Sequence, residues 1–138
     1  MAANTTPIFL KAVNEQWISG VVTANTSFDM STGTSYLIFT ADATNGSKIE
    51  DVYINHQGTN IASVVRFFVN NGSSTGTHAN QVLVHEETVA ANTASQVAAS
   101  VPVVWRAGLV LKPGFKLYCT TGSTVASGYH VAAVGGDF

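Results

Sequence analysis

Short runs of alternating hydrophobic and polar residues recur about every ten positions along this chain. Stretches rich in Gly, Asn, Ser and Thr separate the runs, a spacing typical of β-strands joined by turns. Residues 90–100 are rich in alanine but show no amphipathic stripe, so we predict a loop there, with a short helix as the alternative. We predict eight strands, at residues 16–22, 35–41, 48–56, 61–70, 81–89, 101–106, 115–121 and 129–135.

Two of the predicted strands indicate which way their side chains face. Phe115, Leu117 and Cys119 alternate along one strand, so Cys119 is predicted to be a small core residue rather than a nucleophile. The strand at residues 61–70 is apolar on both faces. Ile61, Val65, Phe67 and Val69 lie on one face, and Val64 and Phe68 lie on the other with Arg66. Such a strand needs cover on both sides, from a second sheet or from another subunit.

Turn signals complete the fold prediction. Asn45-Gly46 and Asn71-Gly72 favour tight hairpin turns, because Gly readily adopts positive φ, and Pro113-Gly114 favours a further turn. We therefore predict an all-β antiparallel sandwich of the jelly-roll type. The predicted organisation is an N-terminal arm at residues 1–15 and a single β-sandwich domain at residues 16–138.

The predicted arm contains a short apolar segment, Pro7, Ile8, Phe9 and Leu10, on a polar lead. Two interpretations stay open: a frayed terminus, or an extended arm that lies across a neighbouring molecule. The chain shows neither the basic leader and apolar run of a secretory signal nor a stretch long enough to span a membrane. We therefore expect synthesis and folding in a cytoplasmic compartment.

Charge is scarce: 10% of the residues are Asp, Glu, Lys or Arg and 46% are hydrophobic. Soluble domains carry about 25% charged residues, which keep them solvated and apart. A chain with so few charges is predicted to use its surface for a partner or an ordered assembly. The formal net charge is −2 and the basic residues are scattered, which argues against binding to nucleic acid or to membranes.

Candidate chemistry is sparse, and we predict neither an enzyme nor a cofactor or metal site. The four histidines, His56, His78, His85 and His130, show no metal-ligand spacing. His85 and Glu87 share a face of a predicted strand, where solvated polar side chains are the simplest interpretation. Trp17 and Trp105 are predicted to lie in the core or at an interface, with stacking on sugar rings as the alternative.

Five segments together resemble small virion structural proteins of tailed bacteriophages. They are residues 39–47 (FTADATNGS), 58–60 (GTN), 65–72 (VRFFVNNG), 111–117 (LKPGFKL) and 125–138 (VASGYHVAAVGGDF). The resemblance runs from about residue 20 to the C-terminus, and turn and strand patterns carry it rather than catalytic motifs.

The resemblance implies a capsid decoration, or cement, protein on the outer surface of the phage head. Its implied partners are the major capsid protein and further copies of itself, as a homotrimer. A tail- or fibre-associated virion protein is the nearest alternative, and a carbohydrate-binding β-sandwich module is the alternative from another class. Candidate partner-binding residues are Pro7, Ile8, Phe9 and Leu10 in the arm, with Trp17 and Trp105 as anchors by residue type.

Overall fold

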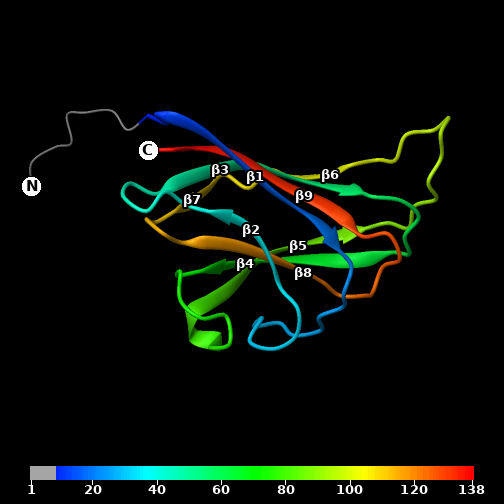
Figure 1. The fold of residues 1–138 in the computed structure, drawn as a ribbon, viewed down its shortest axis with the longest axis horizontal. Coiled ribbons are helices and arrows are strands. Elements are labelled where there is room, and N and C mark those ends of the chain that lie inside the picture. The colour runs from blue at the N-terminus through cyan, green and yellow to red at the C-terminus, as the bar shows by residue number, and fades with distance from the viewer. Residues whose placement is uncertain (1–8) are drawn as a thin grey trace, which may run out of the picture.

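The structure, a computed structural model, describes residues 9–138 and places two antiparallel sheets face to face (Figure 1). Sheet A contains β1 (Ala12–Val21), β9 (Tyr129–Asp137) and β3 (Ser47–His56), with β6 (Val103–Trp105) and β7 (Leu109–Leu111) along its far edge. Sheet B contains β2 (Tyr36–Thr40), β8 (Lys116–Thr121), β4 (Ser63–Asn70) and β5 (Gln81–Val89). The predicted all-β antiparallel sandwich is confirmed. A single 3₁₀ turn, η1 (His78–Asn80), is the only helical element within residues 9–138.

The strands pair in a nested order. β1 pairs with β9, β2 with β8, β3 with both β6 and β7, and β4 with β5. If β6 and β7 are counted as one interrupted strand, the chain has eight strands in the described residues. The first then pairs with the eighth, the second with the seventh, the third with the sixth and the fourth with the fifth. This wrapping supports the finer prediction of a jelly roll.

The strand prediction differs from the structure in two main ways. β1 begins at Ala12, so residues 12–15, which we predicted to be arm, belong to sheet A. They are held there by pairing with β9 and by a 2.7 Å hydrogen bond from Asn14 Nδ2 to Asp137 Oδ1. The prediction of one strand at 101–106 also missed β7. The edge of sheet A consists of two short strands, and Gly108, with a φ of 53°, lies in the break between them.

The core fills the space between the sheets with aliphatic and aromatic side chains. Leu117 and Cys119 are fully buried there and Phe115 packs against them, as the alternation predicted. Phe67 is also fully buried at the centre of β4. Burial of apolar surface on this scale is the main stabilising contribution to such a sandwich.

Both faces of β4 are covered, but only one of them by a predicted source. Sheet A covers one face, and a loop of the same chain, rather than a second sheet or another subunit, covers the other. Phe68 is fully buried although it lies outside the main core cluster, as is Met30. The loop at residues 22–35 lies beneath sheet B (Figure 1). Arg66 holds this loop, since its guanidinium lies 4.2 Å from the centre of the Phe28 ring and donates to Asn25 O at 3.4 Å.

The predicted turn glycines adopt the expected conformation but serve different connections. Gly46, Gly72 and Gly114 have φ values of 80°, 91° and 73°. Neither Asn-Gly pair closes a tight hairpin. Gly46 lies between β2 and β3, which belong to different sheets, and Gly72 opens the longer connection between β4 and β5. The local backbone was therefore predictable, whereas the strands that each turn joins were not.

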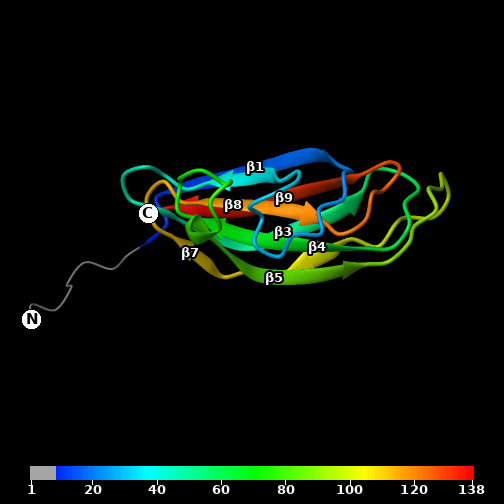
Figure 2. The ribbon, with the colours of Figure 1, turned by 90° about the horizontal axis from the view of Figure 1, so that it is seen from below.

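The loops at one end of the sandwich are tied together by a buried amide. Asn60 Oδ1 accepts hydrogen bonds from Ser127 N at 2.8 Å and Gly128 N at 3.1 Å, and Asn60 Nδ2 donates to Gly128 O at 2.8 Å. The backbone of Asn60 also exchanges two hydrogen bonds with Asn92. Residues 90–102, which we name the projecting loop, extend outward from this end of the sandwich, which is the end far from the C-terminus (Figure 2). The prediction of a loop at 90–100 is confirmed.

Candidate interaction surface

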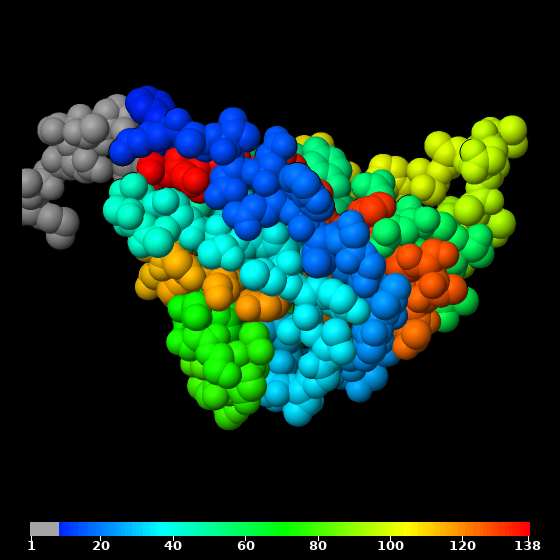
Figure 3. Space-filling model, viewed as in Figure 1, coloured from blue at the N-terminus to red at the C-terminus, as the bar shows by residue number. Residues whose placement is uncertain are grey.

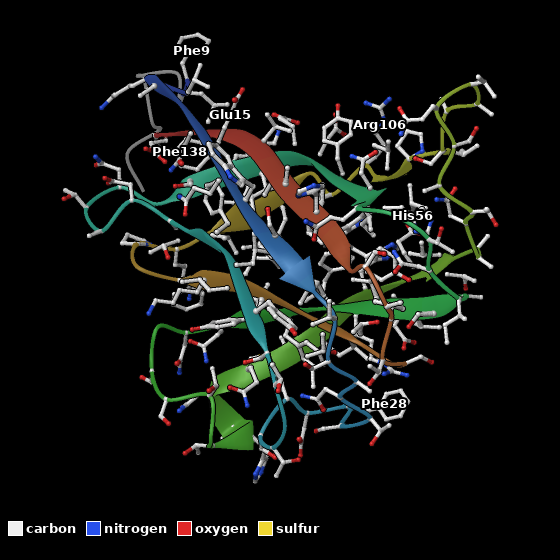
Figure 4. The ribbon with its side chains drawn as sticks, turned by 45° about the vertical axis from the view of Figure 1, so that its right-hand side comes forward. Phe9, Glu15, Phe28, His56, Arg106 and Phe138 are labelled. Carbon is white, nitrogen blue, oxygen red and sulfur yellow. The ribbon has the colours of Figure 1, made fainter. Side chains whose placement is uncertain are left out.

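The structure disperses the predicted partner-binding residues. Pro7 and Ile8 lie outside the described residues. Phe9 and Leu10 precede β1, with 71% and 40% of their surfaces exposed. Figure 4 shows Phe9 pointing away from the sheets. Lys11 N donates to Asp137 O at 2.7 Å, so the chain is already joined to sheet A one residue after Leu10.

The two tryptophans lie on opposite faces of sheet A. Trp17 is 68% exposed on the outer face of β1. Trp105 is half-buried and turns inward, where its ring lies 5.0 Å from that of Phe67 and 4.5 Å from that of His85. Trp105 therefore packs in the interior, one of its two predicted settings, and only Trp17 is available to a partner.

A continuous row of side chains crosses the outer face of sheet A at the level of Trp17. Strand register places Trp17 opposite Ala132, Ala132 opposite Tyr53, and Tyr53 opposite Val104. Neighbours of Tyr53 and Ala132 along the strands are buried, so these two side chains face outward. We name these four residues the outer row. Sequence reasoning missed Tyr53, Ala132 and Val104, because alternation shows that each faces outward but not which strands are neighbours.

The projecting loop is the second exposed apolar feature. Val97 and Val101 are 97% and 82% exposed, and residues 88–105 contain no Asp, Glu, Lys or Arg. The loop stands away from the body of the molecule in Figure 3. A hollow of about 200 Å³ lies between the loop and His56, Gln57 and Gly58. Loops of this length without secondary structure are usually functional or disordered, and this one is anchored at Asn92.

Two histidines each lie within hydrogen-bond distance of a polar side chain, an arrangement that resembles a catalytic pair. His85 Nε2 lies 2.8 Å from Glu87 Oε1, and both side chains face the interior side of β5, as their shared face predicted. They are half-buried rather than solvated, which corrects the simplest interpretation. Ser19 Oγ lies 2.9 Å from His130 Nδ1 on the exposed outer face. We assign no reaction to either pair.

The single cysteine, Cys119, is fully buried. Burial raises the pKa of the Cys119 thiol far above its usual range, which keeps the group protonated and unreactive. No group of three or more His, Cys, Asp or Glu side chains that could hold a metal ion occurs in the described part of the chain. Residues 9–138 contain no helix with the length and apolar character needed to cross a membrane.

Comparison with known proteins gives no relative: no protein-family model, curated protein or solved structure matches this chain.

Proposed function

We propose that this chain is a non-enzymatic structural protein of a tailed-phage virion, a decoration protein that binds the outer capsid surface and stabilises the head. The observation that carries the proposal is the projecting loop, an anchored, uncharged segment that exposes Val97 and Val101. Charged residues are depleted from the cores of protein interfaces, so this composition suits a contact surface. The five segments that resemble phage virion proteins support the same assignment.

The proposed partners are the major capsid protein and two further copies of the chain in a homotrimer. A ligand that binds the assembled shell stabilises that state by about 2.7 kcal/mol at each site when its free concentration is a hundred times Kd. Because the contact repeats at many lattice sites, a modest binding energy at each site is sufficient to stabilise the whole shell. The segment just before β1, which carries the exposed Phe9 and Leu10, lies at the opposite end of the molecule from the projecting loop (Figure 1) and supplies a second apolar contact.

Binding to purified heads tests this proposal. We expect Val97→Asp to weaken attachment at least tenfold, while Val110→Asp on the edge strand β7 leaves it unchanged, because both valines are exposed and their replacement does not disturb the core. Removal of residues 1–10 should weaken attachment without unfolding the sandwich, since β1 begins at Ala12. Light scattering should give a mass near three times 14.4 kDa.

Electron cryomicroscopy of the virion distinguishes the head from other locations. Density for the chain on the icosahedral lattice supports the decoration role. Density confined to the tail or fibre base contradicts it in favour of the tail-associated alternative. Full attachment of both the Val97→Asp variant and the truncated chain would show that neither contact surface is the right one.

A further inference from the structure

The outer row has the composition of a ligand platform. Trp17 and Tyr53 are separated by one strand, and Ala132 between them leaves the space above β9 open. Neighbouring strands lie about 4.8 Å apart, so the backbones that carry the two aromatic residues are about 10 Å apart. Val104 continues the apolar row on the edge strand β6. Aromatic rings presented in this way offer faces on which flat, partly apolar ligands stack.

Polar side chains line both sides of the outer row. On one side the register places Glu15 opposite Val134 and Val134 opposite Asp51, which receives a 3.0 Å hydrogen bond from Arg106. Figure 4 shows Glu15 and Arg106 on the same side of the molecule. On the other side lie three groups that can exchange hydrogen bonds with hydroxyls: Ser19, His130 and Asn55.

The charges on this face select the class of ligand. Arg106 is paired with Asp51, and Lys48 is paired with Glu50 at 2.7 Å. Aromatic platforms on sheets also stack nucleic-acid bases, but those sites combine the rings with unpaired basic groups that follow the phosphates. Here the two basic side chains nearest the outer row, those of Arg106 and Lys48, are already neutralised by neighbouring carboxylates. The face therefore suits a neutral ligand that offers many hydroxyl groups.

The shape of the face indicates a polymer rather than a small molecule. Small-molecule sites are concave and enclose their ligand, whereas the outer row lies on the open surface of a sheet. The loop at residues 22–35 does not cover this surface, because it lies on the other side of the molecule, beneath sheet B (Figure 1). Beside the row, a shallow groove of about 360 Å³ runs between β1 and β2, lined by Glu15, Gln16, Trp17, Leu37 and Ile38. The groove extends the platform past Trp17.

We propose that the outer row binds a neutral polysaccharide, with Trp17 and Tyr53 against the faces of its sugar rings. Glu15, Asn55 and the paired Asp51–Arg106 group contact its hydroxyls. This inference does not depend on the capsid proposal, which uses the projecting loop and the N-terminal segment. It also changes the residues of a sugar-binding surface from the two tryptophans to Trp17 and Tyr53, because Trp105 packs in the interior.

The test is affinity electrophoresis of the full chain through gels that contain a β-glucan, a galactomannan or dextran, with alginate as the anionic comparison. We expect retardation by at least one neutral polymer and none by alginate. Trp17→Ala and Tyr53→Ala should each weaken this binding at least tenfold. Trp17→Phe, which keeps an aromatic ring, should retain most of it. The matched control is Phe28→Ala, which removes an exposed aromatic side chain on the far side of the molecule.

Several results would overturn the inference. They are absence of retardation by all three neutral polymers, retardation by alginate alone, or equal binding by wild type and Trp17→Ala. A change of mass in light scattering on Trp17→Ala substitution, without a sugar effect, would assign the outer row to contacts between copies of the chain. Thermal melting of each variant verifies folding. If Tyr53→Ala fails to fold, Trp17→Ala keeps the test decisive, because that side chain is exposed and its loss does not disturb the core.

Discussion

The rings of His85 and Trp105 stack face to face, with centroids 4.5 Å apart and planes only 10° from parallel. His85 comes from β5 at the edge of sheet B, and Trp105 comes from β6 at the edge of sheet A. The stack therefore joins the two sheets along one side of the sandwich. Phe67 extends it inward, with its ring 5.0 Å from that of Trp105.

This contact predicts unequal losses of stability when the two tryptophans are replaced. Trp105→Ala should lower the free energy of unfolding by about 2–4 kcal/mol, because it removes a half-buried ring that packs on Phe67 and His85. Trp17→Ala should change it by less than about 0.5 kcal/mol, because that side chain is exposed. Urea denaturation followed by circular dichroism measures both. Equal losses for the two variants would contradict the inward placement of Trp105.

Phe67 is the test of the main core. Replacement by Ala should cost about 3–5 kcal/mol, since the ring is fully buried and its loss leaves a cavity between the sheets. Phe28→Ala is the matched control and should cost no more than about 1 kcal/mol, the scale of its contact with the Arg66 guanidinium. An unchanged midpoint for Phe67→Ala would mean that β4 does not face the core as described.

Replacing Asn60 should loosen the loops at one end of the sandwich without unfolding the rest. Its amide satisfies Ser127 N, Gly128 N and Gly128 O, all at one end of the sandwich. Asn60→Ala leaves these groups without that partner and should cost about 2–3 kcal/mol. Hydrogen exchange should quicken at the Ser127 and Gly128 amides while amides in the centre of β4 keep their protection. Uniform acceleration throughout the sandwich would point instead to global destabilisation.

His56 predicts a pH dependence of stability. Burial lowers its pKa below the usual value of 6.5, although a hydrogen bond to the backbone of Ala90 opposes the shift. The contacts of Asn60 Oδ1 with two backbone N–H groups orient Asn60 Nδ2 towards His56 Nδ1, 3.2 Å away, so this nitrogen accepts and must be unprotonated. Tyr129 packs edge-on against the ring, at 5.3 Å between centroids.

Because the folded protein disfavours protonated His56, the unfolded chain takes up the proton first as pH falls. The contribution of His56 to stability is complete above about pH 6.5 and is lost as pH falls from there towards the lower folded pKa. The urea midpoint should therefore be lower at pH 5.5 than at pH 7.5, and His56→Gln should reduce this difference. An identical pH dependence in this variant would assign the effect to other groups.

Cys119 predicts a reactivity that depends on unfolding. Its thiol is fully buried, and burial raises its pKa, so the reactive thiolate is suppressed in the native protein. A chromogenic disulfide reagent should leave the native chain unmodified and label one thiol per chain in denaturing urea. Rapid labelling without urea would show that the core around Cys119 opens readily.

The sequence by itself determined the strands and the direction of many side chains, because alternation and turn chemistry are local properties. The core positions of Leu117 and Cys119 followed from period-two alternation, and the positive φ of Gly46 and Gly72 followed from the Asn-Gly pairs. The start of β1 was less predictable, because the pairing of residues 12–15 depends on the distant strand β9.

Only the tertiary structure decided which residues meet. Alternation divides a strand into two faces, but it carries no information on which strands become neighbours. Pairing of β1, β9, β3 and β6 therefore created the outer row from four separate segments. The same pairing turned Trp105 towards His85 and left Trp17 outside, although residue type alone made the two tryptophans equivalent. Cross-strand neighbours arise from long-range packing, and no local pattern encodes that packing.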